Sequence, residues 1–416
     1  MQSGPSRPRT TRTRRFRVPL AAALTVACLL ATACGSGDEV AAPASPEIDL
    51  SALNVGNYPR EPEVLGTVRN EDEARYAEAM RLAEVVPLPS DIDPDLKFTR
   101  NRDTTRTFIR AEDVIVEEVM NIHPDDFNAS TAGFIGGFYS NAESNRHKSL
   151  SYKLENFVLL FSDEESARHA AIALGEANRR YYADEYQSVD IPGVSDEIAY
   201  WNPEWSMINA WFAHKNFVIL TSVSDYLANE IKTPDLPSLI SRTEGSYSKV
   251  ASAVDKFTPT PRDNWMTLQR DVDGMIGRTV SGTYGMNAED IVPAVYTGRS
   301  VLHGSRDAER DGPSVDEFGV DRASFNGGAL YRARDSESAQ TLADKLAKLG
   351  KLFKPLDPPK GLPFAQCFEA RGKYHSGARF RCIVAADRYA AEIPADQLED
   401  AYQRISSQYS MLINSK

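Results

Sequence analysis

Two stretches of the chain show the same order of apolar and polar positions. Each has a short apolar run typical of a strand, then Asp and Ser residues typical of a helix start, then an amphipathic helical period. The two stretches are Asn156–Tyr182 (NFVLLFSDEESARHAAIALGEANRRYY) and Gly328–Phe353 (GALYRARDSESAQTLADKLAKLGKLF). In both, these polar side chains would satisfy free backbone amides and the positive end of the helix dipole. The pattern therefore predicts the same strand–helix pair twice.

The parallel continues beyond both helices, because each is followed by two apolar stretches and a closing helix. The strands expected in the first copy and then in the second are Ile198–Trp201, Asn209–Val223, Phe364–Ala370 and Ala378–Ile393. Both closing helices contain a Tyr-Ser pair, Tyr247-Ser248 and Tyr409-Ser410. We expect an α+β fold made of two homologous β-α-β-β-α halves, close to ferredoxin-like, with helices on one face of each antiparallel-rich sheet.

The boundary between the two halves is predicted from a break in this pattern. The segment Lys256–Trp265 (KFTPTPRDNW) has two prolines and no apolar period, which is typical of a linker. We therefore place a first α+β domain at residues 48–258 and a second at 259–416. The segments before each repeated unit, 58–150 and 265–327, match no simple template and should add smaller elements.

The N-terminal hydrophobic pattern is that of an export signal. Six arginines and no acid lie between Arg7 and Arg17, and Val18–Ala31 then run apolar for the length of a signal-peptide core. This run is too short to span a bilayer. Small residues precede Cys34, as in a bacterial lipobox, although the bulky aliphatic residue, Leu30, lies one place early. We predict a signal peptide at residues 1–33 and a diacylglycerol thioether on Cys34.

Other interpretations of this segment remain open. Cys34 could be the free first residue of a secreted protein, or the segment could be an uncleaved anchor; Cys28 is a weaker acylation candidate inside the apolar core. Thr13–Phe16 faintly resembles a twin-arginine signal with its aromatic residue one place early, so we expect the general secretory route. Residues 34–47, rich in Gly, Ser, Ala and Pro, suit a lipidated tether. The expected location is the extracytoplasmic face of the cell membrane, which the protein contacts through its lipid.

Composition narrows the class of partner. The chain has 416 residues and a formal net charge of −12, and removing the first 33 residues would take away six arginines and no acid. Such an acidic protein is not expected to bind nucleic acid. Apart from Cys28 and Cys34, the cysteines are Cys367 and Cys382. In an oxidising compartment we expect these two to pair across a hairpin whose turn is flanked by Gly372 and Gly377.

Local motifs for catalysis or cofactor binding are not found in the sequence. There is no Gly-x-Ser-x-Gly elbow, no Ser-x-x-Lys and no phosphate-binding glycine loop, and the histidines are scattered singly. Asp91, Asp93 and Asp95 have the first spacings of a calcium loop, but the glycine and the closing glutamate that such a loop needs are absent. We expect a solvated acidic loop there, and no metal or cofactor.

Aromatic residues give a candidate ligand surface. Three of the four tryptophans lie in Ala199–Trp211 (AYWNPEWSMINAW). Tyr200, Trp201, Trp205 and Trp211 could form a stacking platform for a glycan or a small apolar ligand. The alternative is that these rings pack into the core, as buried aromatic residues usually do.

Two segments resemble those of a known family. The stretch DLSALNVGNYPREPEVLG (Asp49–Gly66) and the C-terminal DRYAAEIPADQLEDAYQRISSQYSMLINS (Asp387–Ser415) are similar to sequences in a large family of actinobacterial envelope lipoproteins. The resemblance covers most of the chain after Cys34. It implies a lipobox, a cysteine pair in the last third and a closing Gln-Tyr element, Gln408-Tyr409, but it implies no activity.

These observations favour a lipid-anchored, non-enzymatic envelope protein that binds a ligand or a protein partner in a cleft between its halves. The alternative is an extracytoplasmic hydrolase of envelope lipids or glycans whose catalytic residues come together only in the folded chain. A third possibility is a structural envelope component without a small ligand. The sequence does not indicate an oligomeric state.

Overall fold

The structure is a computed structural model in which the chain from Ile48 onward forms one compact unit. It describes residues 48–100, 106–114, 116–181, 185–194, 197–282, 293–372 and 378–415. The expected signal peptide, the lipidated Cys34 and the tether therefore lie outside the described residues.

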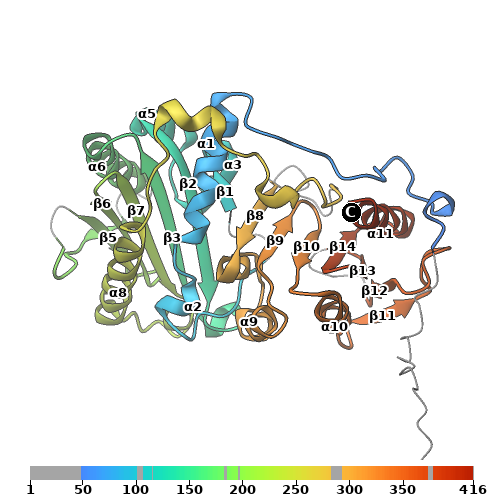
Figure 1. The fold of residues 1–416 in the computed structure, drawn as a ribbon. Helices are drawn as coiled ribbons and strands as arrows, with labels where there is room; N and C mark the ends of the chain where they lie inside the picture. Colours follow the sequence, from blue (N-terminus) through green and yellow to red (C-terminus); the bar gives the residue numbers. More distant parts are fainter. Residues whose placement is uncertain are drawn as a thin grey trace, which may run out of the picture. The chain divides into compact units, whose positions relative to one another are not determined.

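The first sheet is antiparallel throughout, in the order β1-β2-β3-β7-β6-β5-β4 (Figure 1). Its strands are β1 (Arg106–Phe108), β2 (Phe134–Glu143), β3 (Tyr152–Phe161), β4 (Gln187–Ser188), β5 (Ile198–Asn202), β6 (Met207–His214) and β7 (Phe217–Asp225). The central strands β3 and β7 are buried along almost their whole length.

The second sheet repeats the topology of the first. Its order is β11-β12-β13-β14-β10-β9-β8, again antiparallel, so each strand occupies the place of the strand numbered seven lower in the first sheet. The strands are β8 (Ala294–Thr297), β9 (Arg322–Phe325), β10 (Ala329–Arg332), β11 (Phe353–Leu356), β12 (Gln366–Ala370), β13 (Phe380–Ala386) and β14 (Tyr389–Ala395). The predicted duplicated α+β fold is confirmed.

Helices connect and cover these strands. The α-helices are α1 (Glu71–Met80), α2 (Pro89–Ile92), α3 (Ala111–Val114), α4 (Val116–Val119), α5 (Pro124–Ser130), α6 (Glu164–Tyr181), α7 (Tyr226–Glu230), α8 (Leu236–Val254), α9 (Ala308–Glu317), α10 (Ser336–Leu346) and α11 (Leu398–Ile413). Short 3₁₀ helices include η3 (Lys148–Leu150) and η8 (Gly298–Gly304). Within the described part of the chain, no helix is long and apolar enough to cross a membrane.

The two repeated helices begin as their sequences predict. The Asp163 carboxylate accepts a hydrogen bond from the Ser166 amide at 2.8 Å at the start of α6. The Asp335 carboxylate does the same for the Ser338 amide at 2.8 Å at the start of α10. Each bond satisfies one of the backbone donors that a helix leaves free in its first turn.

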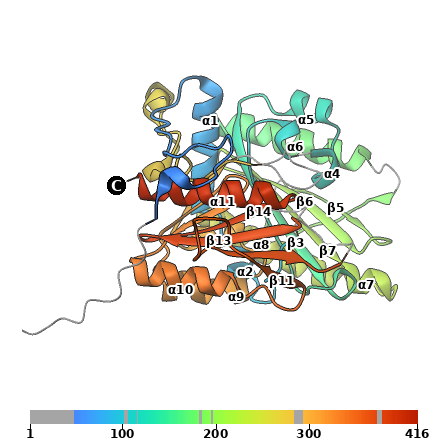
Figure 2. The same ribbon diagram turned by 90° about the vertical axis from the view of Figure 1, so that its right-hand side faces the viewer.

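The helices cover both faces of each sheet, and the expectation of helices on one face is wrong. Phe157, Leu159 and Phe161 pack in one core with α6, whereas Val158 and Leu160 pack in another with α8. Figure 2 shows the equivalent arrangement around β13 and β14, with α11 on one face and α10 on the other. The physical reason is the continuous apolar run of the central strands, because both faces of such a strand must be covered.

In each half, an apolar stretch that was predicted to be one strand contains parts of two. Asn209–Val223, expected to be one strand, lies within a hairpin in which β6 and β7 are joined by Lys215 and Asn216. Ala378–Ile393 likewise lies across β13, a turn at Asp387 and Arg388, and β14. Lys215 and Asp387 have positive φ angles of 52° and 50°, as a two-residue hairpin turn requires.

Candidate functional site

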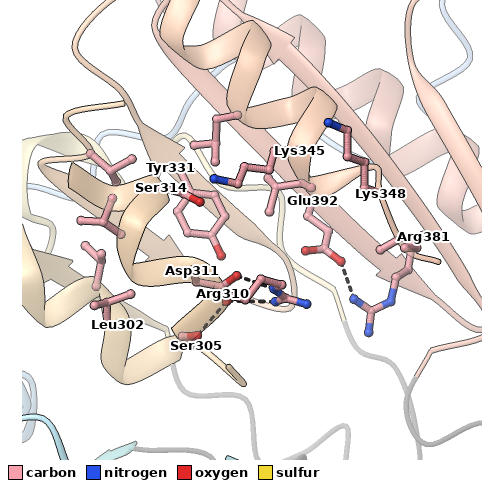
Figure 3. Close-up of a pocket in the computed structure, with 16 residues that line it drawn as sticks. Leu302, Ser305, Arg310, Asp311, Ser314, Tyr331, Lys345, Lys348, Arg381 and Glu392 are labelled. Atoms are coloured by element: carbon pink, nitrogen blue, oxygen red, sulfur yellow. Dashed lines mark hydrogen bonds and ion pairs between the residues drawn. The ribbon is translucent and has the colours of Figure 1, made fainter. Parts of the chain in front are cut away.

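One pocket in the second half combines an apolar wall with charged side chains. It is a cavity of about 110 Å³ lined by residues of η8, α9, β10, α10, β13 and β14, and we call it the α9–α10 pocket (Figure 3). The residues that line it are spread along the sequence from Val301 to Glu392. Only the return of β14 beside β10 brings them together.

The inner wall of the α9–α10 pocket is apolar. Its side chains are Val301, Leu302, Val315, Val320, Leu342 and Leu349. Leu302 and Leu342 are almost fully buried, so this wall is continuous with the hydrophobic core behind it. An apolar group of a ligand would be removed from water here, which is favourable at roughly 25 cal/mol per Å².

Two arginine–carboxylate pairs lie in the pocket. The Arg310 guanidinium donates to both oxygens of Asp311 at 2.6 and 2.9 Å, and the Ser305 hydroxyl donates to the same carboxylate at 2.7 Å. The Arg381 guanidinium donates to Glu392 across β13 and β14. Each acid in the pocket is therefore already neutralised by its own arginine.

Two lysines add positive charge that these pairs do not balance. Lys345, in the last turn of α10, lies 3.5 Å from the exposed carboxylate of Glu317. The ammonium group of Lys348 has no ion-pair or hydrogen-bond partner among the described residues. The pocket thus carries a local positive charge on a strongly acidic chain.

Tyr331 on β10 contributes a hydroxyl group to the pocket. Its ring packs edge-on against Phe325 with centroids 6.1 Å apart, and its hydroxyl has no hydrogen-bond partner in the described part of the chain. Burial, and then the nearby Glu392 carboxylate, raise the pKa of Tyr331 well above its ordinary value. The group therefore stays protonated and can donate a hydrogen bond to a ligand at any physiological pH.

This arrangement suits binding better than catalysis. Neither histidine nor cysteine is among the described residues that line the pocket, and the Ser305 hydroxyl donates to the Asp311 carboxylate, which also accepts two hydrogen bonds from Arg310. Such a carboxylate is a poor base for a serine, whereas nucleophilic serines rely on a neighbouring imidazole or amine.

The predicted aromatic platform is not assembled, and this expectation needs correction. Trp211 is fully buried in the core under α6, and Tyr200 is also buried, with its hydroxyl donating to Glu176 at 3.0 Å. Trp201 is half-buried against the other core. The alternation of side chains along a strand places Tyr200 and Trp201 on opposite faces of the sheet, so they cannot form one surface.

Trp205 alone of these four residues is exposed, with 56% of its surface accessible. It lies in the turn between β5 and β6, where the Asn202 side chain accepts hydrogen bonds from the Glu204 and Trp205 amides. Beside it is an open pocket shared with residues that follow α7, including Lys232 and Pro234.

The predicted cleft between the halves is largely filled. Phe138 of β2 packs against Tyr296 of β8 and His303 of η8, with ring centroids 6.1 and 4.9 Å apart. A pocket of about 320 Å³ does lie at the junction, between α1 and residues near Arg270, but four of its charged groups form ion pairs with one another, Asp72 with Arg110 and Glu73 with Arg270. The fifth, Asp113, accepts hydrogen bonds from the backbone amides of Ile109 and Arg110.

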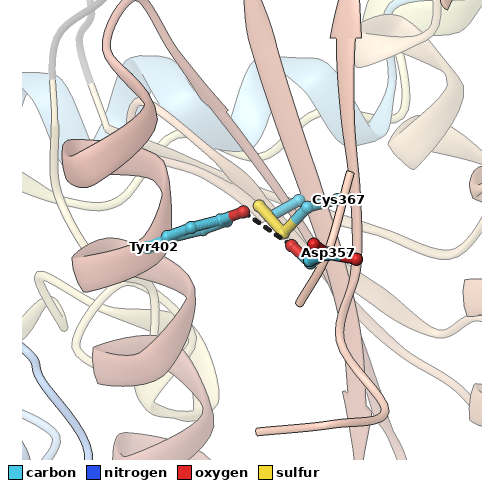
Figure 4. Close-up of a disulfide and its surroundings, with 4 residues drawn as sticks. Asp357, Cys367 and Tyr402 are labelled. Carbon is cyan, nitrogen blue, oxygen red and sulfur yellow. Dashed lines mark hydrogen bonds between the residues drawn. A yellow bond between two sulfur atoms is a disulfide. The ribbon is translucent and has the colours of Figure 1, made fainter. Parts of the chain in front are cut away.

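The predicted disulfide is present. Cys367 of β12 and Cys382 of β13 are bonded and are direct partners in the strand register (Figure 4). Their Cα atoms are 4.1 Å apart, which is the short spacing of a non-hydrogen-bonded antiparallel pair. Beside the disulfide, the Tyr402 hydroxyl of α11 donates to the Asp357 carbonyl at 2.6 Å.

Two of the three aspartates with calcium-loop spacing, Asp91 and Asp93, have side-chain partners. Asp93 accepts hydrogen bonds at 2.7 Å from both Tyr152 and Arg242, and Asp91 pairs with Arg299 at 2.9 Å. Across the described residues, no group of three or more His, Cys, Asp or Glu side chains could hold a metal ion.

Comparisons with known proteins identify the family. Residues 65–270 match the N-terminal domain of unknown function DUF7373, and residues 275–415 match its C-terminal domain. The chain therefore belongs to the DUF7373 family, whose description assigns no activity. No curated protein matches the chain.

One solved structure has a distant similarity to this chain, the extracellular domain of PknH from Mycobacterium tuberculosis. The two are 10% identical, the match covers 44% of this chain and 99% of that one, and the TM-score is 0.24.

Sequence reasoning missed the α9–α10 pocket altogether. Its residues extend from Val301 to Glu392 with no local motif. The one available signal was the cluster of lysines at the end of the second repeated helix, and it was weak because the first repeated helix also ends in basic residues, Arg179 and Arg180.

Proposed function

We propose that this protein is a lipid-anchored protein of the extracytoplasmic membrane face that binds a small ligand without converting it. The proposed location is supported by the N-terminal sequence, with its basic segment, apolar core and Cys34. The binding role is supported by one observation above all: the α9–α10 pocket joins an apolar wall to polar groups, the Tyr331 hydroxyl and the Lys348 ammonium, that have no partner among the described residues.

The geometry around the candidate nucleophiles favours binding over hydrolysis. The serine–histidine contact between Ser140 and His303 is buried, with both residues at most 4% exposed, and the His303 Nε2 atom lies 3.1 Å from the Val86 carbonyl. A substrate could not reach this pair without opening the junction between the two sheets. The described residues that line the α9–α10 pocket, which a small molecule could enter, include no such pair.

Anchoring is tested by fractionation of cells that express the full chain. Cys34→Ala should move the protein from the detergent-soluble membrane fraction to the soluble or secreted fraction, because the variant lacks the acyl chains that would give stable membrane attachment. Cys28→Ala is the matched control and should stay in the membrane fraction. Retention of a processed Cys34→Ala protein in the membrane would refute thioether anchoring.

Binding is tested with two six-carbon probes, 1-hexanol and hexanoate, observed by ligand-detected NMR. At least one probe should bind, and Leu349→Trp, which enlarges a side chain of the pocket wall, should weaken that binding at least tenfold. Leu352→Trp is the matched control, since Leu352 is 73% exposed and does not line the pocket. An affinity for the probe that Leu349→Trp leaves unchanged would contradict the proposal. Hydrolysis of hexanoate esters that this substitution abolishes would contradict it as well.

A further inference from the structure

The polar groups of the α9–α10 pocket indicate the chemical class of its ligand. We infer that the pocket binds a small organic anion, a carboxylate or phosphate monoester that carries a short apolar group. The inference rests on the proposed function, because it names the ligand of the same pocket.

The charged side chains of the α9–α10 pocket leave positive charge that no acid in the pocket balances. Asp311 and Glu392 are each held by an arginine, so neither is available to attract a cationic ligand. Lys345 and Lys348 remain as positive charges above these pairs, and only Lys345 has an acid, Glu317, within 3.5 Å. Because the chain as a whole has a net charge of −12, this local positive charge is a feature of the pocket and not of the general surface.

Several polar groups of the pocket can still donate a hydrogen bond to a ligand. The groups without a partner among the described residues include the Ser314 and Tyr331 hydroxyls, the Lys348 ammonium and the buried Nε–H of Arg381. The ammonium and the guanidinium N–H can only donate, and a hydroxyl can donate as well. A ligand that satisfies the ammonium and the guanidinium N–H must supply acceptors, and carboxylate and phosphate oxygens do so without adding a buried donor that lacks a partner.

The volume of the pocket and its apolar wall limit the size of the ligand and favour an apolar group. In Figure 3 the charged side chains of Arg381, Glu392 and Lys348 lie on one side of the pocket, and Leu302 lies on the opposite side. A dry apolar cavity of about 150 Å³ holds a benzene molecule. The α9–α10 pocket, at about 110 Å³, therefore suits a group about the size of a short acyl chain. An anion with such a group would place its head near the lysines and its chain against the leucines.

The test measures dissociation constants by NMR titration for probes that differ only in the head group: hexanoate, hexyl phosphate, 1-hexanol and hexylamine. Acetate and inorganic phosphate report on the head group alone. We expect both six-carbon anions to bind at least threefold more tightly than hexanol, and hexylamine to bind most weakly. Added salt should weaken only the anions, because it screens exposed charges.

Variants then assign the effect to residues. Lys348→Gln should weaken hexanoate binding about threefold, as expected for one exposed charge, and leave hexanol unchanged. Tyr331→Phe should weaken it by about two- to tenfold through the lost hydrogen bond. Lys351→Gln is the matched control, since Lys351 is exposed and does not line the pocket.

Each outcome separates this inference from the function on which it rests. Equal affinities for hexanoate and hexanol, both reduced by Leu349→Trp, would overturn the anion preference and leave the binding function standing. Acetate or phosphate that binds as tightly as its six-carbon relative would overturn the apolar part of the inference. No binding of any probe would overturn both.

Discussion

The Nδ1 atom of His303 lies 3.3 Å from the Ser140 hydroxyl oxygen, a contact that joins η8 of the second half to β2 of the first. The other ring nitrogen lies 3.1 Å from the Val86 carbonyl, which can only accept, so Nε2 carries the proton and Nδ1 accepts from Ser140. The ring is neutral in this arrangement. Burial lowers the pKa of His303 to about 4.

This contact predicts acid sensitivity. The unfolded chain takes up a proton at His303 near the ordinary pKa of about 6.5, whereas the folded chain does so only near 4. Stability is therefore lost as the pH falls from about 6.5 to 4, by up to about 3 kcal/mol. Urea unfolding at several pH values should show the loss, and His303→Gln should flatten it over that range. His147→Gln, at an exposed site, is the control; an unchanged slope in His303→Gln would contradict the prediction.

The two tryptophans that were expected to share one surface should behave oppositely. Trp211→Ala should destabilise the protein by about 3–5 kcal/mol, because it empties a fully buried site. Trp205→Ala should change the free energy of unfolding by less than about 0.5 kcal/mol. Chemical denaturation measures both values. Similar costs for the two substitutions would show that the assigned burial is wrong.

A pair of glycine substitutions tests the packing of the first half. A Cβ atom added at Gly137 on β2 would lie 2.4 Å from the ring of the buried Phe108, so Gly137→Ala should cost about 1–3 kcal/mol. Gly245 lies inside α8 with no atom within 4 Å of an added Cβ atom. Gly245→Ala should therefore stabilise the protein by about 0.5–1 kcal/mol. The midpoint temperature of thermal unfolding should fall in Gly137→Ala and rise in Gly245→Ala. A change in the same direction in both variants would contradict this packing.

The disulfide should contribute substantially to the stability of the second half. It closes a loop between residues 15 positions apart, which corresponds to about 3 kcal/mol in the chain-entropy model. Replacing both Cys367 and Cys382 with Ser should lower the free energy of unfolding by that order. Protein purified from an oxidising compartment should contain neither residue as a free thiol, and detection of both thiols would refute the pairing.

The duplicated fold could be predicted because its signals are local. Helix caps such as Asp163 and Asp335 and the apolar runs before them lie within a few residues of each other, and the structure confirms both caps. The hairpin turns were harder to find because neither contains glycine. Lys215-Asn216 and Asp387-Arg388 interrupt long apolar stretches, and those polar pairs were the signal that could have divided each stretch into two strands.

The candidate site could not be predicted because its parts meet only through the topology of the sheet. Tyr331 and Glu392 are brought near each other by the pairing of β10 with β14, in which Tyr331 is opposite Ala390. Nothing in the local sequence of either residue distinguishes it from an ordinary strand position. The aromatic cluster had a clear local signal, but the prediction of an exposed surface was wrong. Neighbouring residues of a strand point to opposite faces of the sheet, and Tyr200 and Trp211 are buried.

The most direct test of the central claim is a crystal structure of the protein grown with saturating hexanoate. We expect electron density for one hexanoate in the α9–α10 pocket, with its carboxylate within hydrogen-bond distance of the Tyr331 hydroxyl and the Lys348 ammonium, and its chain against Leu342 and Leu349. Density for hexanoate at another site, with this pocket empty under conditions where binding is measured, would contradict the account.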